Sequence, residues 1–298
     1  DLAKGARRDI ITLLDKLGYG KIMLDTEATQ YGAVETLADA KKAAKLFHDH
    51  SEEIDGLIVI LPNFGDEVGV VETINRANLG VPVLVQACKD EPDKVDVSSR
   101  RDSFCGKISV CNNLVQYGIP FSLTESHTVD IDSDEFAADL DRFARVCRVV
   151  KGLSTARIGA IGARPAPFQT VRASEKILQR DGITVVPVDL SEIIAAANAL
   201  DDQAAEVKTK LSAIREYGKI PNRIVEANIV RQAKLGVVVE NWMAENELDA
   251  SCIQCWESIQ KNYGCATCLT MSMMGEELMP SACEVDINGV VSMYTLAV

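Results

Sequence analysis

The stretch Gly56-Leu57-Ile58-Val59-Ile60-Leu61, ended by Pro62-Asn63, decides the fold class of this chain. An unbroken apolar run of this length, rich in β-branched residues, is typical of a parallel strand that is covered on both faces. Amphipathic helices are expected on either side of it, at about 34–48 and 67–78. A second apolar run, 81–85, follows. Strands and helices that alternate in this way indicate an α/β domain.

The same alternation extends over the whole chain. Before residue 154 the pattern predicts helices at 2–17, 104–117 and 136–149, and a short strand at 21–24. After a predicted linker at 151–154, strands are expected at 156–162, 183–188, 250–255 and 279–285, and helices at about 170–180, from 190 to 245 with a break near Gly218 and Pro221, and at 264–278. The sequence therefore predicts two doubly wound (Rossmann/flavodoxin-like) parallel-sheet domains in tandem, residues 1–153 and 154–298.

Both ends of the sequence suggest a longer protein. The chain opens on a helix, where a βαβ fold usually has a strand first, and it stops at Thr295-Leu296-Ala297-Val298 without a polar tail. We therefore expect that a C-terminal domain is missing from this sequence.

Composition excludes several classes of protein. The 298 residues include 31 Lys and Arg against 44 Asp and Glu, a net charge of −13, with no basic cluster that would bind nucleic acid. No stretch approaches the ~20 apolar residues of a membrane span. The start, Asp1-Leu2-Ala3-Lys4, has no signal-peptide core. The 9 cysteines are odd in number and mostly in apolar contexts, which favours a reduced, cytoplasmic protein.

Cysteine pairs near the C-terminus raise the possibility of a metal site. Cys252-x-x-Cys255 and Cys265-x-x-Cys268 resemble a zinc or iron–sulfur signature. Only nine residues separate the pairs, against roughly 15–20 in paired zinc patterns. The second pair also lies in an apolar helix start. We favour buried core cysteines over a thiolate metal site.

Acidic residues at two expected strand ends are stronger candidates. Glu257 follows one strand, and Glu284 and Asp286 follow the next. Since ligands of open α/β sheets bind beyond the carboxyl ends of the strands, these acids are expected to converge. Such carboxylates bind Mg²⁺ or Mn²⁺ and transfer protons. The alternative is that Asp286 caps the next helix and Glu284 is solvated.

Three loops offer weaker candidates. Arg164 follows a Gly-bearing turn and could hold a polyol or an anion, although a plain strand–helix turn explains it equally well. Asn63 and Phe64 lie in a strand-end loop whose simpler interpretation is a helix cap by Asn63 or Asp66. His127 follows an apolar strand and could reach a ligand.

Several segments in order along the chain resemble the L-fucose/L-arabinose isomerase superfamily, in particular its fucose-isomerase-like branch. The resembling segments are Gly56-Leu57-Ile58-Val59-Ile60-Leu61-Pro62-Asn63-Phe64-Gly65-Asp66-Glu67, Asp102-Ser103-Phe104-Cys105-Gly106, Ile161-Gly162-Ala163-Arg164-Pro165, Gln254-Cys255-Trp256 and Ala282-Cys283-Glu284-Val285-Asp286-Ile287-Asn288-Gly289.

The resemblance implies a metal-dependent aldose–ketose isomerase that works through a cis-enediol. It implies Mn²⁺ or another divalent metal, bound by two acids that also move the proton between C1 and C2, and by a histidine. Glu257 and Glu284 best match the two acids, with Asp286 as an alternative. The family's histidine comes from a later domain, and this chain has no histidine after His127.

The resemblance also implies partners. Members of the family are homo-oligomers in which the N-terminal domain helps to close a neighbour's site, which would give Asn63, Phe64 and His127 a role in binding a sugar in trans. In the same domain as the acids, Arg164 and Trp256 are the expected substrate-binding residues.

The residues themselves fit this chemistry, because proton transfer between adjacent carbons needs a base, an acid and stabilisation of the enediolate. Two rival functions remain at this point. One is a non-catalytic two-domain sugar-binding protein, which would bind sugar without Mn²⁺. The other is a thiol–metal protein that uses Cys252, Cys255, Cys265 and Cys268, and it would hold stoichiometric zinc or iron.

Overall fold

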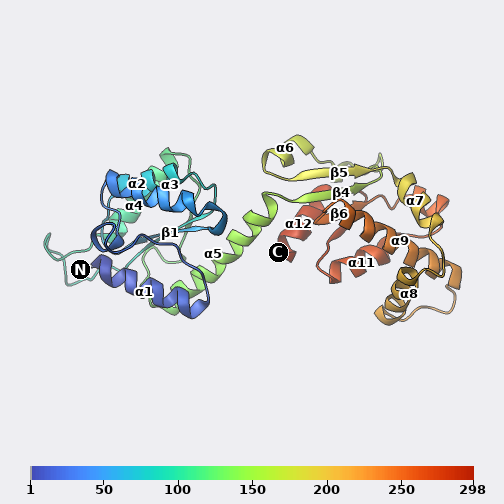
Figure 1. Cartoon of the computed structure of the whole chain (residues 1–298), viewed down its shortest axis with the longest axis horizontal. Helices are drawn as coiled ribbons and strands as arrows, with labels where there is room; N and C mark the ends of the chain where they lie inside the picture. The colour runs from blue at the N-terminus through green and yellow to red at the C-terminus, as the bar shows by residue number, and fades with distance from the viewer. Residues whose placement is uncertain (1) are drawn as a thin grey trace. The chain divides into compact units, whose positions relative to one another are not determined.

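The computed structural model describes residues 2–298 and divides the chain into two compact units, Asp1–Lys151 and Gly152–Val298 (Figure 1). The division falls inside helix α5 (Asp134–Leu153). The prediction of a linker at 151–154 is therefore wrong for residues 151–153, which are helical. The helix continues there because Leu153 packs against the apolar cluster of the second unit.

A three-stranded sheet lies at the centre of the first unit. Its strands are β1 (Leu57–Leu61), β2 (Val83–Ala87) and β3 (Ser122–Leu123), in the order β1-β2-β3 and all parallel. The register pairs Leu57 with Val83 and Leu61 with Ala87. The apolar run that opens the sequence argument is therefore a parallel strand, as predicted.

Helices cover both faces of this sheet. On one face, α1 (Leu2–Leu17) and α5 pack through Ile10 and Phe136 onto Leu84. On the other face, α3 (Glu67–Ala77) and α4 (Ser103–Gln116) pack through Val71 and Val110 onto Val85. Helix α2 (Leu37–Asp49) packs on α3, and the 3-10 turns η1 (Gln30–Gly32) and η2 (Ser51–Glu53) complete the unit.

The second unit has a four-stranded parallel sheet in the order β5-β4-β6-β7. Its strands are β4 (Arg157–Ile161), β5 (Thr184–Val188), β6 (Ala250–Ile253) and β7 (Ser281–Cys283). Its helices are α6 (Glu175–Arg180), α7 (Leu190–Ala199), α8 (Ala205–Tyr217), α9 (Glu226–Glu245), α10 (Ser258–Asn262), α11 (Cys268–Glu276) and α12 (Ile287–Ala297), with the 3-10 turn η3 (Gln169–Val171).

Strand β4 shows how both faces of this sheet are buried. Ile158 and Ala160 join one apolar cluster with residues of α6 and α12. Ile161 joins the other cluster, which contains residues of α7, α9 and α11. Side chains that alternate between two helix-covered faces make a doubly wound sheet. The structure thus confirms the predicted α/β class with parallel sheets.

The remaining differences from prediction concern element ends, one predicted strand that does not form, and three elements outside the predicted ranges, β3, α10 and α12. Residues 21–24 are not a strand, because no neighbouring strand pairs with them. The helices expected at about 170–180 and 264–278 begin later, at Glu175 and Cys268, and the long helical stretch has a further break at 200–204. Within residues 2–298, no helix combines the length and apolarity that a membrane crossing requires.

Candidate active site

Three strand ends meet at one edge of the sheet in the second unit. Strands β4, β6 and β7 are parallel neighbours, so the residues that follow them emerge on the same side. Arg164 follows β4, Glu257 follows β6, and Glu284 and Asp286 follow β7. This is the edge at which open α/β sheets bind their ligands.

Glu284 has the most unusual environment at this edge. Its side chain is buried, with 7% of the residue exposed. Among residues 2–298, no group hydrogen-bonds its Oε2 atom, while its Oε1 accepts a hydrogen bond from the Cys283 Sγ at 3.5 Å. A buried carboxylate oxygen without a partner loses its hydration without compensation, so this atom is suited to a ligand.

The backbone at Glu284 is strained. Glu284 and Val285 have φ angles of 58° and 56°, in the left-handed region. A β-branched residue such as Val rarely adopts this conformation, which costs roughly 1–3 kcal/mol at each position. Strain of this kind clusters at functional sites, and here it turns the Glu284 side chain into the protein.

Two thiols lie beside the Glu284 carboxylate. Ligand atoms of Cys255, Cys283 and Glu284 all lie within 4.8 Å of one another. Burial acts to raise the pKa of the Cys255 thiol, but hydrogen bonds with Thr267, Gln260 and Cys283 outweigh it, so this pKa is lower than that of an ordinary cysteine.

The pKa of the Cys283 thiol is shifted in the opposite direction to that of Cys255. Cys283 is exposed as a residue, but partial desolvation of its thiol, followed by the charges of Cys255 and Glu284, raises its pKa to about 12. Cys283 therefore keeps its proton near neutral pH and donates it to the Glu284 carboxylate. The cluster presents one thiol biased toward the thiolate, one protonated thiol and one carboxylate.

This donor set can be tested against the divalent metal that the sequence led us to expect. The free Oε2 atom of Glu284 fits a hard cation such as Mn²⁺, which prefers oxygen ligands. The sulfurs of Cys255 and Cys283 are softer donors that suit Zn²⁺ better. Glu284 is thus the residue of the cluster that fits Mn²⁺.

The other two predicted acids are used differently in the structure. Glu257 is exposed, lies at the N-terminus of α10 and forms an ion pair with Lys261. It is not part of the cluster of Glu284. Asp286 caps α12, because its Oδ1 accepts a hydrogen bond from the Gly289 N–H at 2.8 Å. The alternative of a capping Asp286 is therefore confirmed, whereas a solvated Glu284 is wrong.

Arg164 and Trp256 shape the loop beside the cluster. The Arg164 guanidinium donates hydrogen bonds to three carbonyl oxygens of its own loop, those of Pro165, Ala166 and Phe168, at 3.0, 3.3 and 3.1 Å. The exposed Trp256 ring meets Phe168 edge-on with ring centroids 5.3 Å apart. Arg164 thus folds the loop, and Trp256 presents an open aromatic surface.

Gln254 is a residue that the sequence argument quoted without giving it a role. Its Oε1 accepts a hydrogen bond from the Ala163 N–H at 2.9 Å, and its Nε2 donates to the Trp256 carbonyl at 3.1 Å. A Cβ atom at Gly162, whose φ is +85°, would lie 2.6 Å from the same Oε1. Gln254 therefore ties the loop after β4 to the loop after β6, and glycine permits the close approach.

The four cysteines of the two predicted pairs do not form one cluster. Cys252 is a core residue that donates to the Gly159 carbonyl at 3.3 Å, and burial raises its pKa to about 12. Cys265 is half-buried and Cys268 is exposed at the start of α11. Within residues 2–298, the only close group of three potential metal ligands is the one with Glu284, so a site made of Cys252, Cys255, Cys265 and Cys268 is not assembled.

The candidates of the first unit gather at the carboxyl edge of its own sheet. Asn63 and Phe64 are exposed after β1, and the Phe64 N–H donates to the Arg101 carbonyl at 2.8 Å. The exposed His127 ring packs against Phe104 with centroids 5.4 Å apart. A Cβ atom at Gly106 would lie 2.1 Å from the Phe64 carbonyl oxygen, so the loop after β1 needs a glycine on α4.

A buried lysine positions the loop of His127. The Lys107 ammonium donates to the Thr124 hydroxyl at 2.7 Å and to the His127 carbonyl at 2.9 Å. Burial lowers the pKa of Lys107. Nothing in the helical pattern of 104–117 distinguished Lys107 from a solvated lysine.

A nearby hollow of about 610 Å³ is lined by Lys89, Asp90, Glu91, Pro92, Arg101, Phe104, Thr128 and Asp130.

Residues 1–154 match the model of the fucose/sulfoquinovose isomerase N-terminal domain. The chain is also similar to curated proteins. A sulfoquinovose isomerase of Priestia aryabhattai is 28% identical over 216 residues, 72% of this chain and 47% of that protein. One of Alkalicoccus urumqiensis is 28% identical over 253 residues, 83% of this chain and 54% of its own length. The chain thus spans about half the length of these relatives.

Proposed function

We propose, from the premise that the chain belongs to the fucose/sulfoquinovose isomerase family, that it is part of a metal-dependent aldose–ketose isomerase. The observation that carries the proposal is the buried Glu284 carboxylate with its free Oε2 at the carboxyl edge of the second sheet. The named relatives support a sugar isomerase as the class of enzyme.

In this mechanism Glu284 both binds the metal and moves the substrate proton. A bound Mn²⁺ ion would supply Lewis-acid stabilisation of the enediolate oxygens. The Glu284 carboxylate would take the proton from C2 and return it to C1 through a cis-enediol, while the O2 hydroxyl proton passes to O1 with the help of the second acid. The Cys283 thiol donates to Oε1, so Oε2 is the oxygen left for metal or substrate. Glu257 is the proposed second acid and Asp286 its alternative.

The sugar is proposed to bind over the loops after β4 and β6. The exposed Trp256 ring offers an apolar surface for one face of the sugar, and Phe168 packs against this ring. Gln254 and Arg164 hold the loop that carries Phe168. We propose an aldose as substrate, with sulfoquinovose as the first candidate because the relatives carry that name.

The first unit is proposed to act through a neighbouring subunit of a homo-oligomer. Asn63, Phe64 and His127 are exposed at the carboxyl edge of its sheet and would contact the sugar there.

The nine cysteines, all within the described residues, are free thiols, which supports a reducing compartment such as the cytoplasm.

The test is Glu284→Gln in the full-length protein, alongside Glu257→Gln, which tests the proposed second acid. Isomerisation of sulfoquinovose and L-fucose is followed with Mn²⁺ present and after chelation, and Mn²⁺ binding is followed by electron paramagnetic resonance. Because the amide neither binds the metal as a carboxylate nor accepts the proton, we expect Glu284→Gln to lose about 10²-fold or more in turnover, together with Mn²⁺ affinity. Circular dichroism checks the fold.

Each outcome tests either the role of one acidic residue or the proposed function as a whole. Full activity of Glu284→Gln would remove Glu284 from the mechanism. A loss in both variants would assign the two acids to Glu284 and Glu257, whereas a loss in Glu284→Gln alone would leave Asp286 as the second acid to be replaced next. Sugar binding without Mn²⁺ and without isomerisation would instead support a sugar-binding protein.

A further inference from the structure

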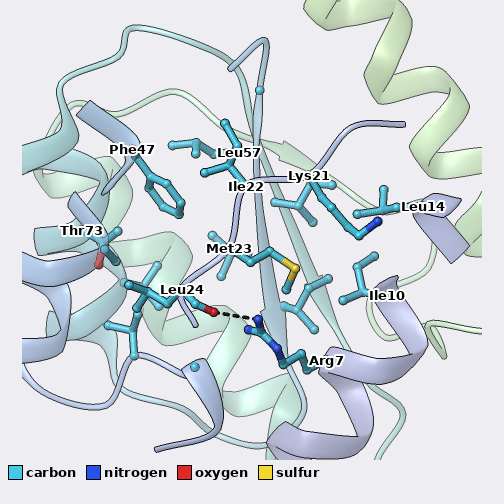
Figure 2. A pocket seen from close by; sticks show the side chains of 18 of the residues that line it. Arg7, Ile10, Leu14, Lys21, Ile22, Met23, Leu24, Phe47, Leu57 and Thr73 are labelled. Carbon is cyan, nitrogen blue, oxygen red and sulfur yellow. Dashed lines mark hydrogen bonds between the residues drawn. The ribbon is translucent and has the colours of Figure 1, made fainter. Parts of the chain in front are cut away.

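The two units offer different kinds of space to a ligand. In the first unit, a groove of about 1180 Å³ is lined by β1 and by residues 22–24, and most of its side chains are apolar, such as Ile10 and Phe47 (Figure 2). Within residues 2–298, its lining brings no three potential metal ligands close together. The side-chain cluster around Glu284 in the second unit does so, and it is the stronger candidate for binding an ion.

Three potential ligands of the second unit converge on one small space. The ligand atoms of Cys255, Cys283 and Glu284 all lie within 4.8 Å of one another. In a tetrahedral zinc site, where the Zn–S bonds are about 2.3 Å long, neighbouring ligand atoms lie roughly 3.5–3.8 Å apart. The group therefore needs only small movements of its side chains to surround a single ion.

Strand pairing and one glutamine hold these ligand atoms in place. Cys283 is the last residue of β7, and it pairs with Ile253 at the end of β6, just before Cys255. The Gln260 Nε2 donates hydrogen bonds to the Cys255 carbonyl at 3.2 Å and to the Cys255 Sγ at 3.6 Å. The left-handed backbone at Glu284, with a φ angle of 58°, directs its side chain into the protein. The donors are thus positioned in advance, which lowers the entropic cost of binding an ion.

The unpartnered oxygen of Glu284 is an independent sign of a cation. Only 7% of Glu284 is exposed, and its Oε2 has no hydrogen-bond partner among residues 2–298. Its Oε1 accepts a hydrogen bond from the Cys283 thiol at 3.5 Å, so sulfur and carboxylate share one proton. A metal ion at this position takes the place of that proton, which leaves to solvent, and it satisfies both the sulfur and the carboxylate.

The two sulfur ligands favour a different ion from the Mn²⁺ of the proposed function. Thiolates select soft or borderline ions such as Zn²⁺, whereas Mn²⁺ prefers oxygen ligands. The Cys268 thiol also hydrogen-bonds with Cys255, but it does not belong to the group whose atoms all lie within 4.8 Å. Three protein ligands then leave the fourth tetrahedral position of Zn²⁺ open to water.

We infer that Cys255, Cys283 and Glu284 form a binding site for Zn²⁺ that competes with the Mn²⁺ of the proposed function. Two thiolates and one carboxylate bind the ion, and a water molecule completes the tetrahedron. Because Glu284 has one free oxygen, Zn²⁺ at this oxygen excludes Mn²⁺ from it and inhibits the enzyme. The zinc site rests on the geometry of the group alone, whereas the competition also rests on the proposed function of Glu284.

Cobalt is the probe for this site, because Co²⁺ occupies zinc sites and gives a charge-transfer band in the near ultraviolet when thiolates bind it. The reduced full-length protein is titrated with Co²⁺ in the absence of oxygen, and so are Cys255→Ser and Cys283→Ser. The matched control is Cys265→Ser, which removes a half-buried thiol of the same unit that lies outside the group. Circular dichroism checks that each variant folds.

The band is expected in the parent protein and in Cys265→Ser, and added Zn²⁺ is expected to bleach it. Since Cys255→Ser and Cys283→Ser each lack one of two thiolate ligands, the band falls to about half and the Co²⁺ affinity falls by at least about tenfold. Absence of the band from the parent protein would overturn the inference. An undiminished band in either ligand variant, or an equal loss in Cys265→Ser, would overturn it as well.

Electron paramagnetic resonance tests the competition separately. Zn²⁺ added to the Mn²⁺-loaded protein should release Mn²⁺, and the Zn²⁺ concentration required should be at least about tenfold higher for Cys283→Ser than for Cys265→Ser. If Mn²⁺ stays bound at Zn²⁺ concentrations that bleach the cobalt band, the competition is wrong and the zinc site stands. If the protein binds no Mn²⁺, the proposed function and the competition both fail, while the cobalt band still decides the zinc site.

Discussion

The two α/β units differ most in how completely their strands are paired. In the second unit, β6 has a strand on each side and all four of its residues are buried. In the first unit, β1 has a partner on one side only among residues 2–298, and four of its five residues are half-buried. The segment 21–24, across the groove, stays irregular. A sequence that favours a strand therefore becomes one only where a neighbouring strand completes its hydrogen bonds.

The units also differ in how their charges are satisfied. At the carboxyl edge of the first sheet, the Arg101 guanidinium pairs with Glu91 at 3.1 Å, although its buried Nε has no hydrogen-bond partner in the described chain. At the same edge of the second sheet, the buried Glu284 keeps one oxygen without a partner in the described chain. The two edges differ in the sign of the group that is left unsatisfied: the orphaned carboxylate oxygen of Glu284 is suited to a cation, and for this reason the proposed metal chemistry is assigned to the second unit.

The largest effect is expected from a glycine pair, one in each unit. A Cβ atom at Gly106 would lie 2.1 Å from the Phe64 backbone oxygen, whereas at Gly159 it would lie 2.6 Å from the Trp242 ring. A side chain can move aside more easily than a backbone. We expect Gly106→Ala to lower the free energy of unfolding by about 3 kcal/mol and Gly159→Ala by about 1–2 kcal/mol.

Urea denaturation measures both glycine variants. Tryptophan fluorescence reports on the second unit, which contains both Trp242 and Trp256. Hydrogen exchange in α4 reports on the first. A smaller loss for Gly106→Ala than for Gly159→Ala would show that the loop after β1 yields more readily than its contact with α4 indicates.

Alkaline pH is expected to have a smaller effect, through Cys252. Burial raises its pKa from 9.0 to about 12. A folded-state pKa above the unfolded value stabilises the fold below the unfolded pKa, and this stability is lost as the pH rises through about 9 toward 12. At about pH 10.5 the loss is roughly 2 kcal/mol in the free energy of unfolding.

Cys252→Ala isolates this contribution, and Cys147→Ala is its matched control in the first unit. Burial raises the pKa of Cys147 to about 11, but Cys147 lies in the first unit, so Cys147→Ala should leave the fluorescence-detected unfolding of the second unit unchanged. Urea denaturation with tryptophan fluorescence from neutral to alkaline pH should show a shallower decline for Cys252→Ala than for the parent chain. Parallel curves would mean that Cys252 ionises no differently in the folded unit.

The smallest effect is expected at two helix caps. Asp66 accepts a hydrogen bond from the Gly69 N–H at 2.6 Å in the first unit, as Asp286 does from Gly289 in the second. If both are plain caps, Asp66→Ala and Asp286→Ala each lower the free energy of unfolding by about 1 kcal/mol. Denaturation and Mn²⁺ binding are measured together. Loss of Mn²⁺ binding in Asp286→Ala alone would make Asp286 a metal ligand as well as a cap.

Much of the fold was predictable because its signals are local. The apolar run at 57–61 and the stripes of α1 and α5 depend on residues close in sequence, and the structure places strand and helices there. The prediction of a strand at 21–24 was wrong because the pairing of strands depends on segments that are distant in sequence. The linker at 151–154 failed because contacts with the second unit extend α5 to Leu153.

The candidate site was predictable only in part. The sequence pointed to acids after two strands, and the resemblance favoured Glu257 and Glu284 over Asp286, but it did not separate the buried Glu284 from the exposed Glu257. Spacing along the chain carries no information on burial, on the pairing of Glu257 with Lys261 or on the cap made by Asp286. Gln254 and Lys107 were missed for the same reason, since their partners lie in other segments.

By itself, the sequence determined the alternation of strands and helices, the acidic surface and the set of residues that follow each strand. These properties depend on hydrophobic period and local backbone preference, which neighbours in the chain decide. Only the tertiary structure decided that Glu284 is the buried acid, that Cys255 and Cys283 lie beside it, and that β1 borders an open groove. Burial and strand pairing arise between segments distant in sequence, and a linear pattern does not record them.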